Sequence, residues 1–430
     1  MTSVPFDVLE LIMSFLDAEA DLLTCSLICS SFNQAAQHLL HREISLKIAN
    51  SEKTATHFER FPDYAAWVRG CSLDLNLRSG TPSVPRGLGP SESTHCLPLL
   101  RRLTHVRHLV LQNGSWYDLR EIAPRIRDAI LDLIDRVLSH GPSHSLHIRG
   151  VSFPRHLVGR LIQYSTHLSL GDIYFDHFAT TEGGSPRPPP RIASGPFLES
   201  LVIGTRGGDV LTKLYLVSDD PRYLTKLKSL QIGLIRDDYF PFANVRYEEG
   251  TRKYVSGMAD KLVQTRSLYA AELPILLPSL RELHMVEHGH LRSSLVYPWL
   301  SPAIVALALW KLSTPTLRRI HILIRHYWYS FYPPYGGLQH ISLPPDTMTT
   351  LDEALSLRLI AGTVVDLDVH YFLACNGADA ATGSLDMVMK PNARFVSSFG
   401  EALQRSLALG LNLRFFGADG VQWYSRAGYV

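Results

Sequence analysis

The chain has few cysteines for its length. Its 430 residues include five, at positions 25, 29, 71, 96 and 375. Such a sparse, odd-numbered set does not form a disulfide framework or the paired spacing of a zinc site, and it fits free thiols in a reducing compartment. Cys25 and Cys29 stand four residues apart, which predicts one shared helical face. We therefore expect a cytoplasmic or nuclear protein with no structural metal.

The sequence also lacks an excess charge and a long apolar run. Lys and Arg number 42 against 40 Asp and Glu, so the formal net charge is +2 and no strong field attracts nucleic acid or anionic lipid. The most apolar late run, residues 299–312, contains Pro302 and is too short to span a membrane. Asp7 and Glu10 lie where a signal peptide would be basic and apolar. We expect no nucleic-acid partner and no membrane association.

Recognisable catalytic motifs are absent as well. The sequence has no Walker-type phosphate loop, no strand-following G-x-G-x-x-G and no G-x-S-x-G nucleophile elbow. Residues 284–288 read H-M-V-E-H, an inverted zinc-protease motif, but His284 falls in an expected strand, where the two histidines would not share a helical face. We expect no enzymatic activity, no catalytic residue, no metal and no cofactor.

Residues 4–46 contain apolar side chains at helical spacing, interrupted twice. The three runs fall at residues 8–16, 22–27 and 29–41, and Pro5 suits a first helical turn. They predict three short helices joined by tight turns. A unit of about 40 residues is usually too small to be stable by itself. Two interpretations follow: a helical cap on the next domain, or a docking surface for another protein.

The same stretch resembles the F-box, the motif that binds the Skp-type adaptor of cullin-RING ubiquitin ligases. The matching segments are Val4-Pro5, Glu10-Leu11-Ile12 with Phe15-Leu16, and residues 21–32, D-L-L-T-C-S-L-I-C-S-S-F. Residues 38–46, H-L-L-H-R-E-I-S-L, resemble an ending common in mushroom-type fungi. The departures are Val4 for Leu, Ile28 for Val and Ser30 for a basic residue.

The resemblance implies an F-box domain at residues 1–47 that docks a Skp-type adaptor and, through it, a cullin. It does not separate adaptor-facing positions from those in the core of the bundle. The candidate adaptor-binding residues are Pro5, Leu9, Ile12, Leu16, Leu22, Leu23, Leu27, Ile28, Cys29 and Phe32.

A short motif, L-x-x-L-x-Φ with Φ apolar, recurs through the rest of the chain. Its centre predicts a short strand that points alternate residues into a core, and stacked copies would bury a continuous core. The interval ranges from 22 residues (Leu146 to Leu168) to 53 (Leu230 to Leu283), so the array resembles an irregular leucine-rich repeat. The copies lie near residues 103–111, 146–148, 168–170, 198–203, 227–232, 280–285 and 317–322, with looser ones at 357–369 and 411–415.

Amphipathic segments between these copies predict helices. The clearest is residues 124–138, with others at 56–67 and 352–361. Ser398 and Glu401 form a capping-box pattern that predicts a helix start, and Gly410 its end. Strand–helix alternation favours an α/β fold with a parallel sheet. We expect a three-helix F-box followed, over residues 48–430, by a degenerate leucine-rich-repeat-like α/β solenoid.

An aromatic run at residues 326–335 is a candidate for target binding, because Tyr and Trp are frequent interface anchors. Packing within its own repeat is the other interpretation. The candidate residues are Tyr327, Trp328, Tyr329, Phe331, Tyr332 and Tyr335.

The sequence favours a substrate receptor of a Skp–cullin–F-box ligase, whose N-terminal helices dock the adaptor and whose repeat domain holds an unknown target protein. The alternative is a leucine-rich-repeat-like scaffold or recognition protein outside any ligase, with the N-terminal helices as a cap.

Overall fold

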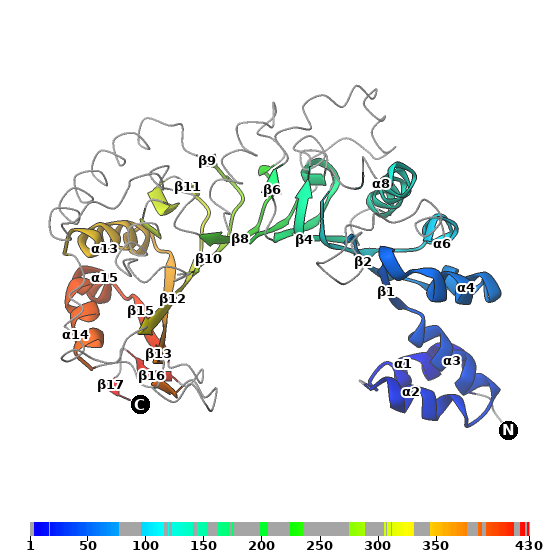
Figure 1. Ribbon diagram of the computed structural model, residues 1–430. Helices are drawn as coiled ribbons and strands as arrows, with labels where there is room; N and C mark the ends of the chain where they lie inside the picture. The colour runs from blue at the N-terminus through cyan, green and yellow to red at the C-terminus, as the bar shows by residue number, and fades with distance from the viewer. Residues whose placement is uncertain are drawn as a thin grey trace. The chain divides into compact units, whose positions relative to one another are not determined.

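The computed structural model divides into two compact units, residues 1–198 and 199–430. Descriptions are confined to residues 4–16, 18–76, 96–115, 119, 123–140, 144–153, 161–171, 174–175, 198–204, 224–234, 275–288, 305–306, 308–310, 312–330, 345–375, 386–388, 393–416, 422–425 and 428–429. Figure 1 gives the element labels. Among these residues, no helix combines the length and apolarity needed to cross a membrane.

Unit 1 begins with the three helices that the sequence predicts. They are α1 (Phe6–Met13), α2 (Glu19–Ser26) and α3 (Ser30–Leu40), and Figure 1 shows them packed against one another. Pro5 is the N-cap of α1 rather than its first residue. Cys25 lies in α2 and Cys29 is the N-cap of α3, so the prediction of one shared helical face was wrong.

An open parallel sheet follows in unit 1. Each neighbouring pair from β1 to β5 is parallel, and the short β6 pairs with β4. The strands are β1 (Glu43–Lys47), β2 (Gly70–Asp74), β3 (His108–Ser115), β4 (Ser145–Phe153), β5 (His167–Gly171) and β6 (Tyr174–Phe175).

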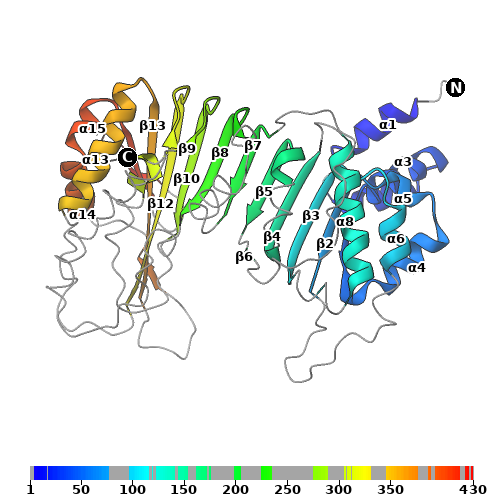
Figure 2. The same ribbon diagram turned by 90° about the horizontal axis from the view of Figure 1, so that it is seen from above.

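Helices cover one side of this sheet, and Figure 2 shows α6 and α8 beside it. They are η1 (Ile48–Asn50), α4 (Glu52–Arg60), α5 (Tyr64–Trp67), α6 (Cys96–Arg102) and α8 (Pro124–Ser139). The apolar stripe predicted for residues 124–138 is buried in α8. The predicted single helix at 56–67 is two helices, because Pro62 falls between α4 and α5 and removes a backbone N–H.

In unit 2 the described strands form an open sheet arrangement whose central strands are parallel. The strand order is β7-β8-β10-β12-β13-β15-β16-β17, and β14 pairs with β13 beside this path. In the described part, the antiparallel pairs are β13–β14, β15–β16 and β16–β17. The strands are β7 (Ser200–Ile203), β8 (Ser229–Leu234), β10 (Glu282–His288), β12 (Arg319–Ser330), β13 (Val364–Cys375), β14 (Asp386–Val388), β15 (Asn412–Phe416), β16 (Gln422–Ser425) and β17 (Gly428–Tyr429), with a separate pair β9 (Ile275–Leu276) and β11 (Leu312–Ser313).

The L-x-x-L-x-Φ copies align in register, as their stacking requires. In unit 2, Leu230 pairs with Leu283, which pairs with Ile320, and Ile320 pairs with Val365. These four side chains are at most 1% exposed. The motif therefore supplies one apolar row across the sheet, and the intervening residues point to the opposite face.

The helices of unit 2 are α13 (Pro345–Ile360), α14 (Ala393–Ala402) and α15 (Gln404–Ala408). Gly410 follows α15 with a φ of +104°, a left-handed conformation that suits glycine at a helix end. The predicted helix start at Ser398 was wrong, because Ser398 lies inside α14. Ser398 and Glu401 match a capping box, but α14 already begins at Ala393, and the buried Val396 and Phe399 lie on either side of Ser398 within the helix.

Arginines join successive helical segments on the helix side of both units. Arg136 of α8 donates to Leu100 O and Leu103 O at 2.6 and 3.3 Å. In unit 2, Arg358 of α13 donates to Leu309 O and Leu312 O at 2.6 and 2.7 Å. Burial lowers the pKa of both guanidinium groups. Each arginine thus satisfies carbonyls near the end of the preceding segment that would otherwise be buried without a partner.

The observed architecture is a mixed α/β structure with N-terminal helices and parallel sheets that do not close. The expected domain boundary between residues 47 and 48 stays a prediction.

Candidate protein-docking surface

The three N-terminal helices enclose a very small core. Its fully buried members are Leu9, Met13, Ala35 and Ala36, none more than 4% exposed. Partly buried apolar residues surround them: Phe6, Leu16, Leu22, Cys25, Phe32 and Leu39. Two of the four buried side chains are single methyl groups, so α3 approaches α1 closely at little cost in cavity volume.

An unusual amount of apolar side chain remains outside this core. Of the 14 large apolar residues that are exposed in the described part of the chain, eight fall within residues 4–28. They are Val4, Val8, Leu11, Ile12, Phe15, Leu23, Leu27 and Ile28. Clustered exposed apolar side chains typically mark an interaction surface, because leaving them in water forgoes the free energy of burial.

Helical spacing places four of these residues on one side of α1 and the turn that follows it. Val8, Leu11, Ile12 and Phe15 follow one another at intervals of three and four residues, which places them within one stripe. Their exposed fractions range from 43% to 77%. Leu9 and Met13 form the opposite, buried stripe, so α1 is apolar on two faces.

The structure divides the ten predicted adaptor-binding residues into two groups. Leu9, Leu16, Leu22 and Phe32 pack within the bundle. Pro5, Ile12, Leu23, Leu27, Ile28 and Cys29 are exposed. Only the second group presents side chains to a partner, and whether each binds one stays a prediction.

Sequence reasoning missed four exposed residues of this surface: Val4, Val8, Leu11 and Phe15. The signal was present, because one stripe at intervals of three and four residues runs beside another in α1. The core of the three-helix bundle needs only one of these two apolar stripes, so the other is left for the surface.

A polar contact that the sequence did not reveal fastens α1 to α3. His38 Nδ1 lies 2.9 Å from Glu10 Oε1, with both side chains partly buried. The His38 ring also meets the edge of Trp67 in α5, with centroids 5.4 Å apart. Glu10, which the resemblance places in the motif, therefore has a structural role here.

Aromatic rings join the three helices to the rest of unit 1. His41 Nε2 lies 3.0 Å from His57 Nε2, and the His41 ring lies 4.2 Å from that of Tyr64 between centroids. Burial lowers the pKa of His41, outweighing its hydrogen bond to Gln37 O, and His57 lowers the pKa further. Since His41 Nδ1 donates to Gln37 O, Nε2 of a neutral His41 is an acceptor, and His57 Nε2–H is the donor between the two facing nitrogens.

Comparison with protein families matches residues 1–47 to the F-box-like family. F-box domains generally bind Skp-type adaptors. Comparison with curated protein sequences gives no match. The family match covers the three helices and β1. The same segment carries the eight exposed apolar residues between positions 4 and 28.

The predicted target-binding aromatics fall at the end of β12. Tyr327, Trp328 and Tyr329 belong to the strand, where they pair with Phe372, Leu373 and Ala374 of β13. Pairing with β13 continues to Ser330, so β12 runs into the first part of the aromatic run. Phe331, Tyr332 and Tyr335 lie outside the described residues.

No group of three or more His, Cys, Asp or Glu side chains that could hold a metal ion occurs in the described ranges. His284 and His288 lie in β10, the strand setting that the sequence indicated.

Proposed function

We propose that the chain is the substrate-receptor subunit of a Skp–cullin–F-box ubiquitin ligase. The N-terminal helices dock a Skp-type adaptor, and the following α/β region, a degenerate leucine-rich-repeat-like solenoid, holds a target protein. The receptor itself breaks and forms no bond; it works in the cytoplasm or nucleus and raises the local concentration of target lysines near a ubiquitin-carrying enzyme. The form of residues 38–46 favours the mushroom-type fungal variety of this family.

The observation that carries the proposal is the exposed apolar face within residues 4–28, which coincides with the F-box-like match. A helical cap would direct its apolar side chains toward the sheet that it covers. Here, Ile12, Phe15 and Leu27 are 57%, 77% and 85% exposed, while His38 in α3 and His41 at its C-cap make the contacts with α5 and α4. The surface therefore fits a second protein better than a terminal cap.

The test is co-purification of a Skp-type adaptor with the full chain and with an Ile12→Glu/Leu27→Glu variant. Both side chains are exposed, so the charges are tolerated in the free chain but lie in the apolar contact when the adaptor binds. We expect adaptor and cullin with the wild-type chain and neither with the variant. Deleting residues 1–46 is a poorer test, because it also removes most of β1 and exposes the edge of β2.

A matched control carries the same two charges elsewhere. Leu357→Glu/Ile360→Glu on α13 changes two side chains of unit 2 that are 58% and 61% exposed. It should retain the adaptor. Equal recovery of adaptor with the wild-type chain and the double variant would refute the proposed docking surface.

A further inference from the structure

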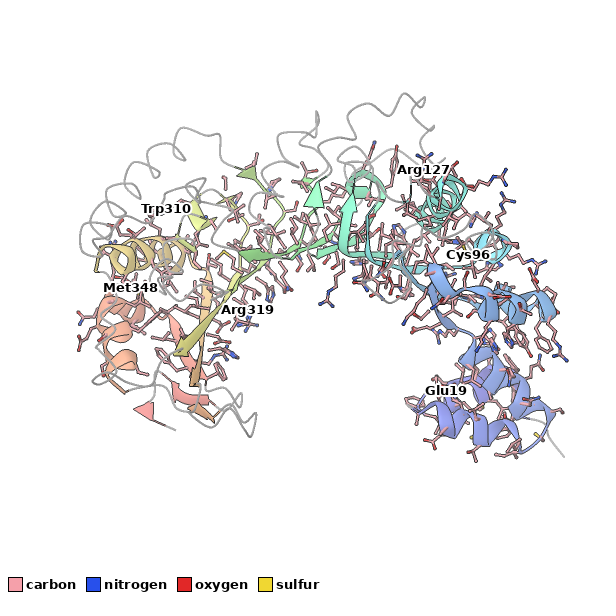
Figure 3. All side chains as sticks on the ribbon, in the orientation of Figure 1. Glu19, Cys96, Arg127, Trp310, Arg319 and Met348 are labelled. Carbon is pink, nitrogen blue, oxygen red and sulfur yellow. The ribbon has the colours of Figure 1, made fainter. Side chains whose placement is uncertain are left out.

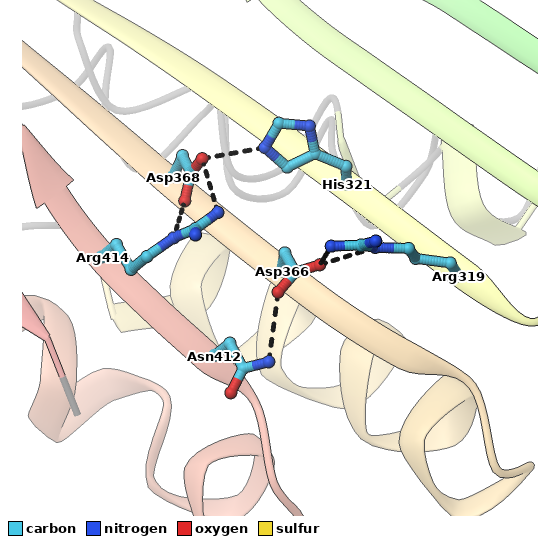
Figure 4. A network of polar contacts seen from close by, with 6 residues as sticks. All are labelled: Arg319, His321, Asp366, Asp368, Asn412 and Arg414. Carbon is cyan, nitrogen blue, oxygen red and sulfur yellow. Dashed lines mark hydrogen bonds and ion pairs between the residues drawn. The ribbon is translucent and has the colours of Figure 1, made fainter. Parts of the chain in front are cut away.

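The sheet of unit 2 carries a polar network on its exposed face. Its residues come from β12, β13 and β15, and Figure 4 shows them converging on two aspartates. Figure 3 shows Arg319 on the side of the sheet away from α13. The alternate residues Ile320, Leu367 and Leu413 are buried on the other side, as the two-residue period of a strand requires.

Asp366 and Asp368 are the buried centres of this network, with side chains 7% and 9% exposed. Arg319 Nε donates to Asp366 Oδ2 at 3.0 Å, and Arg319 Nη2 lies 2.9 Å from the same oxygen as an ion pair. Asn412 Nδ2 donates to Oδ1 at 3.1 Å. Burial alone would raise the pKa of Asp366, but the hydrogen bonds from Arg319 and Asn412 outweigh it and hold the pKa below its ordinary value. The ionised form of Asp366 is therefore favoured, and it holds the Arg319 guanidinium in place.

Asp368 orients the second guanidinium in the same way. Arg414 Nε and Nη2 donate to its two oxygens at 2.6 and 2.9 Å, and His321 Nε2 lies 2.8 Å from Oδ2. A planar guanidinium held by two parallel bonds loses its rotational freedom before any ligand arrives. The buried aspartates thus hold two arginines in place in advance.

Between these arginines and β10 lies a hollow of about 260 Å³. It is lined by Glu282, His284, Arg319, His321 and Arg414. A liquid water molecule occupies about 30 Å³, so the hollow has room for a planar group of three or four heavy atoms with water around it.

The lining offers many donors and few acceptors. Each guanidinium has five N–H groups, and the contacts with Asp366 and Asp368 use two of them on each arginine. Glu282 supplies the one carboxylate that lines the hollow in the described part of the sheet. The unused N–H groups therefore suit a ligand that accepts hydrogen bonds.

The charge of the site limits the charge of that ligand. Two arginines (+2) and the carboxylates of Glu282, Asp366 and Asp368 (−3) sum to −1 when His284 and His321 are neutral. The sum becomes +1 when both imidazoles are protonated. Burial lowers the pKa of His284, and the nearby His321 and Arg319 lower it further against the opposing effect of Glu282. A singly charged anion thus needs less proton uptake than a doubly charged one.

We propose that this hollow binds the carboxylate of an acidic side chain, Asp or Glu, on the target protein. The planar carboxylate matches the paired N–H groups of a guanidinium. Because it carries a single negative charge, it requires less protonation of the two histidines than a doubly charged anion would. The proposal rests on the proposed function in one respect, that the α/β region holds a target. It is independent of adaptor docking, so the two can fail separately.

The first measurement uses a blocked triglutamate peptide as the probe and the full chain without adaptor. Binding is followed by NMR through the imidazole signals of His284 and His321, which are assigned with His284→Gln and His321→Gln variants. We expect saturable shifts of both signals with triglutamate and none with triglutamine. Tighter binding of triglutamine, or of a trilysine peptide, would overturn the proposal.

Glu282→Gln is the sharpest variant, because Glu282 is exposed and lies outside the Asp366 and Asp368 hydrogen bonds. Removing its charge at pH 7.5 should strengthen triglutamate binding by about two- to fivefold, from the Coulomb energy of one charge a few ångströms away in water. A cation-binding hollow would show the opposite sign. Weaker triglutamate binding in this variant therefore contradicts the assignment.

Arg414→Gln removes one of the two oriented guanidiniums and should weaken binding by about 10- to 100-fold, the range for a charged hydrogen-bonding partner. Arg107→Gln, an exposed arginine of unit 1, is the matched control and should bind normally. Arg414→Gln also leaves Asp368 with fewer hydrogen-bond partners, so the fold of this variant is checked by circular dichroism. If the variant does not fold, the binding of triglutamate to Glu282→Gln tests the proposal instead.

A phosphoserine tripeptide distinguishes the two anion types. We expect triglutamate to bind at least as tightly at pH 7.5, and binding to tighten by up to about tenfold per pH unit below the ordinary range of histidine if one proton is taken up. Much tighter phosphoserine binding would show that the hollow is a phosphate site and would overturn the carboxylate assignment.

Discussion

Truncating Leu27 to alanine should separate adaptor binding from folding. Leu27 is the C-cap of α2 and is 85% exposed, so almost none of its side chain contributes to the core of the bundle. An exposed position of this kind typically changes the free energy of unfolding by less than about 0.5 kcal/mol. Burying a leucine side chain against a partner contributes about 1.5–3 kcal/mol. The dissociation constant for the adaptor should therefore rise by about 10- to 150-fold with no change in thermal stability.

Met13→Ala provides the contrasting case. Met13 is 1% exposed at the centre of the same bundle. Its truncation should cost about 2–5 kcal/mol of folding free energy, because it removes buried surface and leaves a cavity. Binding then fails because the bundle unfolds, and thermal unfolding of the free chain already shows the loss.

The assay pairs adaptor titration by calorimetry with thermal unfolding of the free chain. Leu357→Ala, an exposed leucine of unit 2 at 58%, controls for general loss of surface leucine and should bind adaptor normally. The reasoning is refuted if Leu27→Ala binds adaptor as the wild-type chain does, or if its free chain is destabilised as strongly as Met13→Ala.

Three further outcomes follow from the structure. Arg358→Met should lower the free energy of unfolding by about 2–4 kcal/mol, because two buried carbonyls lose a charged donor, and urea unfolding measures it. In the native chain, iodoacetamide should label Cys29, which is exposed, long before Cys71, because burial raises the pKa of the Cys71 thiol to about 12, and peptide mass spectrometry after timed labelling reads this out. The pKa of Asp366 is lowered on folding, so its contribution to stability is complete above about pH 4 and lost as pH falls through the folded value; Asp366→Asn should flatten the acid limb of the stability curve.

Much of the fold could be predicted because its signals are local. The three N-terminal helices, the stripe of α8 and the aligned L-x-x-L-x-Φ strands all depend on the period of one element. Element ends were less certain. The expected start at Ser398 falls inside α14, where Val396 and Phe399 on either side of it are 4% and 2% exposed.

The candidate sites could be predicted only in part, for a different reason. Separating Leu9 from Ile12 requires knowing which of two apolar stripes of α1 faces α3, and three-residue spacing alone does not say. The pairing of Asp366 with Arg319 and of Asp368 with Arg414 joins residues 47 and 46 positions apart. Such pairs depend on strand register, which only the aligned sheet supplies.

The arginines that link successive helical segments bear on how the chain would respond to mechanical force. Arg136 and Arg358 each fasten one segment to the carbonyls of its predecessor, and the parallel strands also contact mainly their nearest neighbours. Within each unit, tension applied at one end would therefore load one strand–helix layer at a time. A single-molecule extension trace should show a series of small steps, with the longest pauses where a buried arginine must release its carbonyls.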